Sequence, residues 1–457
     1  MSYRRIALAL LCAHALRTPT LGGQSPAASR SPLDVLVAEG LVGNPLLRAR
    51  NLAVTREDAA VAEAKGRFLP SVTANARASA LSGAPNLGAL INPAYAALNQ
   101  LLGRNDFPTN LNLTLPQRQE ATLRLAQPLF EPRVLEGYRI ARSLRAASAA
   151  DRDAQRRQLA SDTQTAYLQY ARAHRAADLF DATVPLLDEA LRVSKRLLGV
   201  GKVTPDNVLR ARAEQSAVVQ QRDAAHQLTG AARQQLNYLT GRPIDAPLAL
   251  FNDSLLGFDA RFAARRDLIT AQSKAQESRE ELTQLDRSTD AVQAQRRLAR
   301  AAYLPSMSVA LDYGFQGNTI RVGRNTDFSV ASLVVSWNLF NGGQDRARVQ
   351  QAALDAAQLS ARRDDAARGI ALQVRVAHDA ADVARTAITT ATDRLASGIR
   401  TFELVQRRFS EGMASQLELL DARTALTDAQ LNRLITTYDF YQRVVEFERA
   451  AALFPLE

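Results

Sequence analysis

Residues 305–315 read PSMSVALDYGF, and apolar residues alternate with small or polar ones along the whole stretch. The apolar set comprises Met307, Val309, Leu311, Tyr313 and Phe315. Because successive side chains of a strand point to opposite faces, this period predicts a strand of about ten residues with one apolar face. Such strands are typical of transmembrane β-barrels, and half-buried strands of soluble sheets look the same, so the pattern alone leaves both open.

Three further stretches predict strands, giving candidate spanning strands at 70–80, 119–130, 305–315 and 328–340. Trp337, the only tryptophan, lies near the end of the last strand, where an aromatic belt at a membrane interface is expected. Four strands cannot close a barrel, since known barrels need about eight or more. Open edges in lipid leave backbone groups unpaired. If these strands span a membrane, several chains must share one barrel.

The chain contains two copies of one plan. RFSEGMASQLELLDARTA (408–425) aligns with LLGVGKVTPDNVLRARAE (197–214). WNLFNGG (337–343) aligns with QPLFEPR (127–133), and RAAYLPSMSVALDY (300–313) with GRFLPSVTANARA (66–78), in the same order. The spacing differs by one insertion of about 25 residues in the first copy. This insertion is rich in Gly, Pro and Asn, so residues 81–118 are predicted to form a long loop.

The repeats set the expected domain organisation. The first repeat, 29–243, is predicted to hold a helix at 34–69, two strands around the loop, and helices at 131–199 and 203–240. Residues 244–262 are predicted to link the repeats. The second repeat, 263–457, is predicted to hold a helix at 263–302, two strands, and helices at 342–411 and 415–452. A helix of about 70 residues is on the order of 100 Å long.

Periodicity in the last helix predicts two helical neighbours. One seam with alternating spacings of three and four runs through Leu417, Leu420, Thr424, Thr427, Leu431, Leu434, Tyr438, Tyr441 and Val445. A second seam beside it comprises Leu419, Ala422, Leu426 and Ala429. Two seams fit the wall of a helical tube, and they also fit an ordinary coiled-coil bundle.

A glycine interrupts each pair of long helices. Gly412 is predicted to end one helix in the left-handed conformation, and Ser415 to cap the next, with Glu418 completing a capping box. In the first copy Gly201 and Thr204 are expected to do the same, with Pro205 at the first helical position. Each break is therefore predicted to be a tight helical hairpin.

The N-terminus and the charge bound the class of protein. Residues 1–28 are expected to be a secretory signal peptide, and Cys12, the only cysteine, lies in it. A mature chain without cysteine has no disulfide or thiol chemistry, and Leu11 before Cys12 argues against lipidation. The net charge is +11, but arginines are interleaved with acids, as in RRDDAARG (362–369), so a nucleic-acid surface is not expected.

The pattern as a whole resembles the TolC-like outer-membrane efflux and secretion protein family. The stretches that carry the resemblance cover nearly the entire mature chain and recur in both repeats. They are GNPLLRARNLAVTREDAAVAEAKGRFLPSV (43–72), AQPLF (126–130), VGKVTPDNVLRARAE (200–214), LNYLTGRP (236–243), AAYLPSMSVALDY (301–313), SWNLFNGG (336–343) and EGMASQLELLDARTAL (411–426).

The resemblance implies a mainly α protein with transmembrane β-strands. Three chains would form a homotrimer, give four strands each to one shared β-barrel, and continue it as a long α-helical coiled-coil barrel through the periplasm. The function implied is a passive export duct of a tripartite efflux pump or type I secretion system, carrying drugs, metals or polypeptides across the outer membrane. The implied partners are a periplasmic adaptor (membrane fusion) protein, an inner-membrane pump or ABC transporter, and outer-membrane lipid. The loop 81–118 would face the cell exterior.

The resemblance also assigns candidate site residues at the two hairpin tips. The adaptor-binding surface would comprise Gly201, Lys202, Val203, Thr204, Gly412, Met413, Ala414 and Ser415. The alternative is that these are turn residues only.

Two acids beside the second tip match acidic positions of the family that narrow the periplasmic opening. Glu418 and Asp421 would form stacked acidic rings in a trimer, which favour cations. The first copy has Asn207 and Arg210 at the matching places, and Arg210 would be able to pair with an acid of a neighbouring hairpin. Alternatively, Glu418 only caps its helix and Asp421 is an exposed acid favoured by the helix dipole.

Signals of enzyme chemistry are weak. His14, His174, His226 and His378 are scattered and suggest no metal site, and no cofactor is expected. GVGK (199–202) lacks the glycine spacing of a phosphate loop, and Val203 stands where Ser or Thr is needed. The competing class is a periplasmic coiled-coil scaffold or adaptor, which would have one hairpin, no repeat and no strand pairs.

Overall fold

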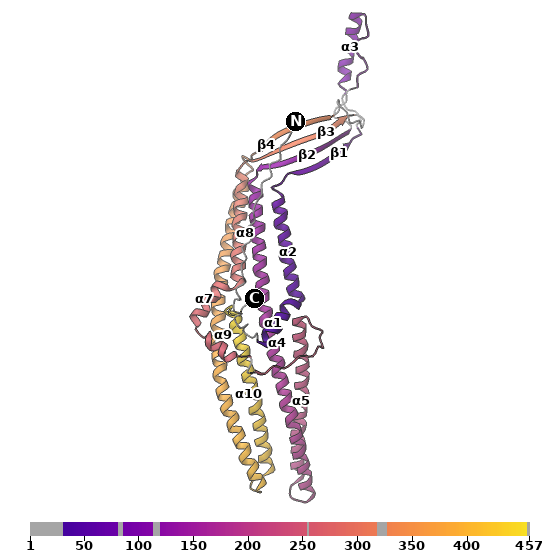
Figure 1. Cartoon of the computed structure of the whole chain (residues 1–457). Helices are drawn as coiled ribbons and strands as arrows, with labels where there is room; N and C mark the ends of the chain where they lie inside the picture. The colour runs from indigo at the N-terminus through magenta and orange to yellow at the C-terminus, as the bar shows by residue number, and fades with distance from the viewer. Residues whose placement is uncertain (1–30, 81–85, 113–118, 254–255, 318–326, 455–457) are drawn as a thin grey trace, which may run out of the picture.

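The computed structural model describes residues 31–80, 86–112, 119–253, 256–317 and 327–454. The expected signal peptide, with Cys12, lies outside these residues. The molecule is elongated, with a sheet near one end and two long helical hairpins reaching to the other (Figure 1). In the described part of the chain, no helix is both long and apolar enough to cross a membrane.

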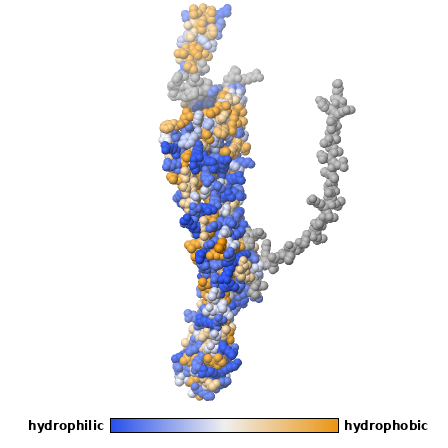
Figure 2. Space-filling model, turned by 90° about the vertical axis from the view of Figure 1, so that its left-hand side faces the viewer, coloured by the Kyte–Doolittle hydropathy of each residue, from blue (hydrophilic) through white to orange (hydrophobic). Residues whose placement is uncertain are grey.

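The four strands form one antiparallel sheet in the order β1-β2-β3-β4. They are β1 (Ser71–Ala78), β2 (Gln119–Phe130), β3 (Ser306–Gly317) and β4 (Asp327–Ser336). The register pairs Leu123 with Tyr313 and Val309 with Leu333, so the apolar positions predicted from the alternation share one face. Figure 2 shows hydrophobic surface gathered at this end of the molecule, above a largely hydrophilic shaft.

The opposite face of the sheet carries charged pairs on β1, β2 and β3 and apolar residues on β4. Arg77 pairs with Glu120 across β1 and β2 at 2.8 Å, and Arg124 pairs with Asp312 across β2 and β3 at 2.7 Å. The expected strand at 328–340 ends at Ser336, so Trp337 lies just past β4 and not within it. There its indole Nε1 donates a hydrogen bond to the carbonyl oxygen of Tyr303 at 3.0 Å.

The long helices form a single layer. They are α4 (Pro132–Gly199), α5 (Pro205–Thr240), α9 (Gln344–Ser410) and α10 (Gln416–Ala450). The helix α10 contacts α9 on one side and α4 on the other, as its two seams predict. On the α9 side Gly398 approaches Ala429, and on the α4 side Leu420 joins the apolar cluster of Phe180 and Leu191. The sequence of neighbours is therefore α5, α4, α10, α9.

The lead-in segments are broken where single helices were expected. Residues 34–69 give α1 (Pro32–Gly43) and α2 (Pro45–Gly66), because the Asn44 side chain accepts hydrogen bonds from the N–H groups of Leu46 and Leu47 and starts a new helix. Residues 263–302 give the end of α6 (Phe258–Ala264), then α7 (Leu268–Ser278), α8 (Glu280–Arg300) and a short 3₁₀ turn (Ala301–Tyr303). Towards the sheet, α4 has α2 and α8 as neighbours.

The prediction of an irregular loop at 81–118 is wrong for its centre. Residues Gly88–Leu102 form the helix α3, which projects beyond the sheet at the end opposite the hairpin tips (Figure 1). The glycines and Pro93 suggested a loop, but Pro93 is accommodated within the helix.

Three tyrosine hydroxyls hold the irregular link between the repeats against the middle of the shaft. Tyr170 of α4 donates to the carbonyl oxygen of Leu248 at 3.1 Å, and Tyr438 of α10 donates to Asp253 at 2.9 Å. Tyr167 accepts a hydrogen bond from the Phe251 N–H at 2.8 Å and stacks on the Phe251 ring. Burial raises the pKa of Tyr167 to about 12. The link is thus part of the main core, together with Phe258, Phe262 and Phe447.

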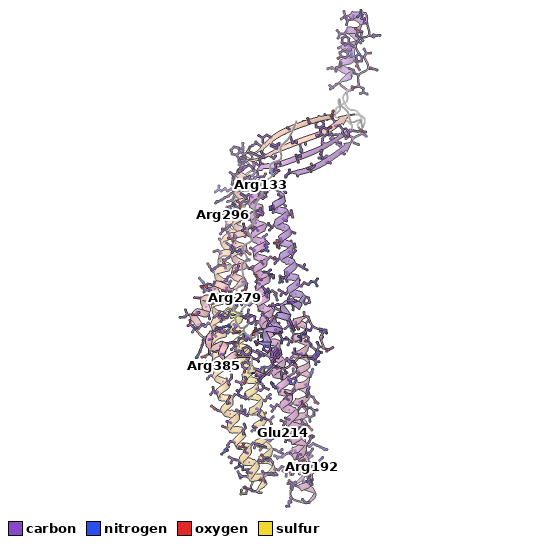
Figure 3. All side chains as sticks on the ribbon, viewed as in Figure 1. Arg133, Arg192, Glu214, Arg279, Arg296 and Arg385 are labelled. Carbon is purple, nitrogen blue, oxygen red and sulfur yellow. The ribbon has the colours of Figure 1, made fainter. Side chains whose placement is uncertain are left out.

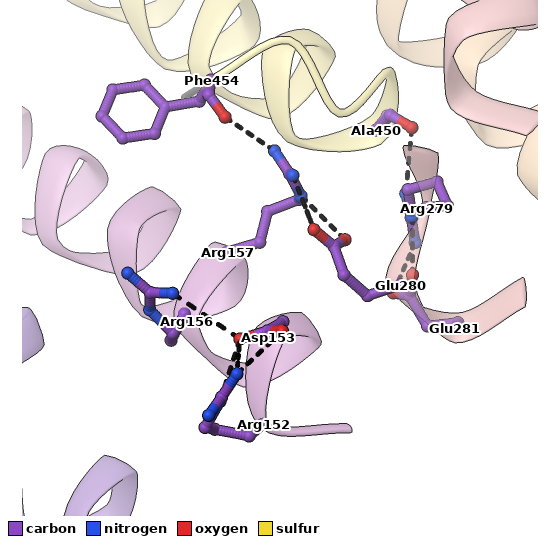
Figure 4. A network of polar contacts seen from close by, with 9 residues as sticks. All are labelled: Arg152, Asp153, Arg156, Arg157, Arg279, Glu280, Glu281, Ala450 and Phe454. Carbon is purple, nitrogen blue, oxygen red and sulfur yellow. Dashed lines mark hydrogen bonds and ion pairs between the residues drawn. The ribbon is translucent and has the colours of Figure 1, made fainter. Parts of the chain in front are cut away.

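An arginine network locks the C-terminal end of α10 to both repeats (Figure 4). Arg157 of α4 pairs with Glu280 at 2.6 Å and donates to the Phe454 carbonyl oxygen at 2.8 Å. Arg279, at the break between α7 and α8, donates to the Ala450 carbonyl oxygen at 3.0 Å and pairs with Glu281. These contacts tie the middle of the shaft to the end of α10.

Replacing Tyr167→Phe should destabilise this level. The change leaves the buried Phe251 N–H without its acceptor, which costs about 1–3 kcal/mol. The thermal unfolding midpoint should fall, and proteolysis within 244–257 should become faster. The matched control is Tyr238→Phe, whose ring is 64% exposed, and it should change neither. Equal behaviour of the two variants would contradict the role given to Tyr167.

Candidate functional site

The two hairpin tips are built in the same way. At the second tip Gly412 has φ +75°, its N–H donates to the Phe409 carbonyl oxygen at 3.0 Å, and the Met413 N–H donates to that of Arg408 at 2.7 Å. At the first tip Gly201 has φ +69°, and its N–H donates to the Leu198 carbonyl oxygen at 3.0 Å. The Lys202 N–H donates to the Leu197 carbonyl oxygen at 2.9 Å. This is the Schellman arrangement that ends a helix on a left-handed glycine. The predicted helix stops are confirmed at both positions.

The helix starts that follow the two tips differ. At the second tip the capping box is complete, since the Glu418 N–H donates to the Ser415 hydroxyl at 3.2 Å and the Ser415 N–H donates to the Glu418 carboxylate at 3.1 Å. At the first tip Thr204 occupies the N-cap and Pro205 the first helical position, but the Thr204 side chain makes no capping hydrogen bond. The prediction of a side-chain cap is therefore wrong for Thr204. Its hydroxyl bonds instead to the side chains of Asp206 and Asn207.

The capping box sets the ionisation of Glu418. The hydrogen bonds from the Ser415 backbone and hydroxyl, helped by Arg408 at 4.0 Å, lower the pKa of this carboxyl below its usual 4.5. A lowered pKa in the folded state means that the charged form stabilises the tip at neutral pH, and that this contribution is lost as the pH falls through the lowered value. The carboxylate is therefore charged under all ordinary conditions.

The four predicted aperture residues lie on the first two turns of α5 and α10. Glu418, Asp421 and Arg210 are exposed and Asn207 is half-buried. Within one chain Glu418 bonds to its own hairpin, and Asn207 donates to Thr204 at 3.0 Å. Within one chain, Arg210 contacts neither Glu418 nor Asp421. Asp421 and Arg210 are exposed and face away from the core that α4 and α10 share.

Contacts between the two hairpins near the tips were not foreseen. Gln416 at the start of α10 donates to the hydroxyl of Ser194, which is fully buried on α4. Thr424 of α10 donates to Glu214 of α5 at 2.8 Å, close to the tip end (Figure 3). Gln416 and Ser194 carry no periodic signal, because each is a polar residue at a position that a seam would fill with an apolar one.

An apolar groove of about 250 Å³ runs beside these contacts, between α4, α9 and α10. Its lining includes Phe402, Phe409 and Leu419, and the Arg423 guanidinium stacks 5.2 Å above the Phe402 ring. Burial lowers the pKa of Arg423 without neutralising it at any ordinary pH. The groove is a mainly hydrophobic surface whose charged lining residues are Arg423 and Glu189.

Exposed residues cover both tips. Val200 is 68% exposed and Met413 60% exposed. Lys202 is an exposed cation on the first tip. Within the described residues, no three His, Cys, Asp or Glu side chains lie close enough together to hold a metal ion.

Comparisons with known proteins agree with this architecture. Residues 271–452 match the sequence model of the family described as outer membrane efflux protein. Among curated proteins, none matches the sequence.

Several solved structures have the same fold. A membrane protein from Pseudomonas aeruginosa superposes with a TM-score of 0.76 at 18% identity, over 93% of both chains. The CmeC outer membrane channel of Campylobacter jejuni gives 0.73 at 18% identity, over 92% of this chain and 85% of that one. The open state of the MtrE outer membrane channel of Neisseria gonorrhoeae gives 0.70 at 18% identity, over 92% and 89%.

Removing the two N-cap side chains should affect the two tips unequally. Ser415→Ala removes an acceptor for a helix N–H and should cost about 0.5–2 kcal/mol of local stability. Thr204→Ala removes no bond to the helix backbone and should cost close to nothing. Hydrogen exchange of the amides in 416–420 and 206–209 measures both effects. Equal acceleration at the two tips would show that the difference in capping does not matter.

Proposed function

We propose that this chain is a member of the outer membrane efflux protein family and forms the outer-membrane channel of an export system as a homotrimer. The observation that carries the proposal is the sheet. It is apolar on one face, polar on the other and open at both edges, and it is continuous with helices long enough to cross the periplasm. A periplasmic scaffold or adaptor is not favoured, since the chain has two hairpins and two strand pairs.

The open edges argue for several copies. Strands β1 and β4 each lack a neighbour on one side, and unpaired backbone groups in lipid cost several kcal/mol each. Because β1 and β4 run in opposite directions, β4 of one copy meets β1 of the next in the antiparallel sense used within the chain. Three copies then close a barrel of about 12 strands, within the range of known barrels.

The helical layer has open edges of the same kind. On α9 the exposed stripe Leu372, Val376 and Val383 faces away from α8 and α10, with Val383 71% exposed. The opposite edge of the layer carries exposed Leu52 on α2 and Leu209 and Leu228 on α5. Apolar stripes on both outer edges suit a head-to-tail ring, in which each α9 packs along a neighbour's α2 towards the sheet and along its α5 towards the tips.

A ring of this kind is a duct and needs no chemistry of its own. Its inner surface would be lined by the polar face of the sheet and by the helices below it. Energy for export would come from an inner-membrane pump or ABC transporter, reached through a periplasmic adaptor (membrane fusion) protein. The exported class is drugs, metals or polypeptides.

The tips are the surface proposed for the adaptor. They are the end of the shaft farthest from the sheet, and they carry the exposed side chains of Val200, Lys202 and Met413 (Figure 1). The two Schellman turns fix the backbone here, so the exposed groups are held in place before a partner arrives. Val203, Ala414 and the other predicted tip residues complete this surface.

The aperture proposal concerns Glu418 and Asp421. Three copies of each, one turn apart, would form two acidic rings at the periplasmic mouth. Glu418 serves two purposes in this proposal, because capping uses one carboxylate oxygen and leaves its charge in place. Arg210 of the first repeat is exposed near Asp206 of its own helix and would be able to meet an acid of a neighbouring copy.

The trimer is tested at the α9 edge. The double variant Val376→Glu/Val383→Glu should leave the single chain folded, since both positions are exposed, but should abolish the trimer by burying charge in the interface. Native gels of detergent-solubilised outer membranes measure it. The control is Thr389→Glu, which is exposed on the same helix about a third of a turn away from the stripe. A trimer that survives the double variant, or a wild-type protein found soluble as a monomer, would refute the assembly.

The acidic rings are tested by conductance. Glu418→Gln/Asp421→Asn should abolish cation selectivity and block by divalent cations in planar bilayers, because it removes both rings without changing side-chain size. The control is Ser415→Ala, which weakens the cap but keeps both carboxylates, and it should keep the selectivity. Unchanged selectivity in the double variant would remove the acids from the aperture.

A further inference from the structure

The insertion between β1 and β2 contains a regular helix with an exposed apolar face. In the described residues 86–112, α3 (Gly88–Leu102) is followed by an extended return segment that packs along it. Gly88 makes this possible, because a Cβ there would lie 1.8 Å from the Leu111 carbonyl oxygen. Gly103, with φ +61°, ends the helix and turns the chain back.

Two asparagines fasten the return segment to one side of α3. Asn92 donates to the Leu111 carbonyl oxygen at 3.0 Å and accepts from the Leu111 N–H at 2.9 Å. Asn99 does the same with Phe107, at 2.7 and 2.9 Å. The two asparagines are seven residues apart and so lie on one face, where the rings of Tyr95 and Phe107 also pack at 5.3 Å. The helix is thus held rigidly by its own loop.

The opposite face of α3 has no partner among the residues that the structure describes. It carries a seam with alternating spacings of three and four, made of Leu87, Leu90, Ala94, Ala97 and Leu101, and all five are exposed. Leu90 is 81% and Leu101 84% exposed. Figure 2 shows the hydrophobic surface of this projection. Such spacing is that of the a and d positions of a coiled coil.

The chemistry of the seam points to another copy of itself. The helix α3 has no charged residue over its whole length, so identical copies meet without like-charge repulsion and a charged partner gains nothing from it. A membrane surface is a poorer match, because interfacial helices carry Lys or Arg on the polar face and Trp or Phe on the apolar one. The only aromatic ring of α3, Tyr95, is turned inward against Phe107.

We propose that the exposed seam of α3 binds the α3 seams of the neighbouring copies, forming a small helical bundle beyond the outer end of the shared barrel. This inference rests on the proposed trimer. A two-heptad seam is weak in isolation, but attachment to β1 and β2 of one barrel makes the association effectively intramolecular, at millimolar effective concentration. The bundle would narrow the mouth opposite the hairpin tips.

Cysteine cross-linking tests the inference in the full-length protein. In a Cys12→Ser background the chain has no other cysteine. Single variants Leu90→Cys and Leu101→Cys should form disulfide-linked dimers in oxidised outer membranes, which moves up to two of every three chains of the trimer from the monomer to the dimer band on denaturing gels. The control Asp106→Cys is exposed in the return segment, on the fastened side of α3, and should stay monomeric.

The outcomes separate this inference from the trimer itself. A trimer on native gels with cross-links at both seam positions and none at Asp106→Cys supports it. A trimer without seam cross-links, or with equal linking at the control, overturns it and leaves the channel proposal standing. If a fluorophore on Leu90→Cys is instead quenched by lipid-borne quenchers in vesicles, the seam faces lipid and the inference is wrong. Absence of any trimer defeats the proposed assembly, and the α3 bundle with it.

Discussion

The unpaired edges of the four-stranded sheet are the constraint on which the architecture depends. A sheet with one apolar and one polar face suits the boundary between lipid and a water-filled lumen, but its outer strands β1 and β4 leave backbone groups without partners. Pairing β4 of one copy with β1 of an identical copy is the solution that needs no further protein. The even number of strands in each chain lets that pairing stay antiparallel around the ring. Below the sheet, the exposed apolar stripes of α9, α2 and α5 likewise need a neighbouring copy to cover them.

The two repeats share a frame and differ where function is proposed. Both tips end on a glycine with the same pair of backbone hydrogen bonds. Only the second tip has a side-chain cap, made by Ser415 and Glu418, whereas the first-turn acid of α5, Asp206, bonds to the Thr204 hydroxyl. The capping box of the second tip uses one carboxylate oxygen of Glu418 and does not involve Asp421. The charge of Glu418 and Asp421 is therefore available for a role beyond folding.

Much of the fold could be predicted from the sequence, because period-two strands, glycine stops and helical seams are local signals. The features that were missed depend on contacts between distant segments. Asn44 looks like any polar helix residue until its side chain caps α2, and Asn92 and Asn99 read as turn residues until they fasten α3. Thr204 was expected to cap its helix, but Asp206 and Asn207 compete for its hydroxyl. In the site, Ser194 and Gln416 gave no signal at all, since a buried polar pair has no periodicity.

The most direct test of the account is the symmetry of the assembly in a lipid bilayer. Electron cryomicroscopy of the protein purified from outer membranes into nanodiscs would measure it. The account predicts a three-fold particle in which β4 of each copy pairs antiparallel with β1 of the next, above one continuous helical tube. A particle of any other symmetry, or a sheet whose β1 and β4 edges remain unpaired in lipid, would contradict it.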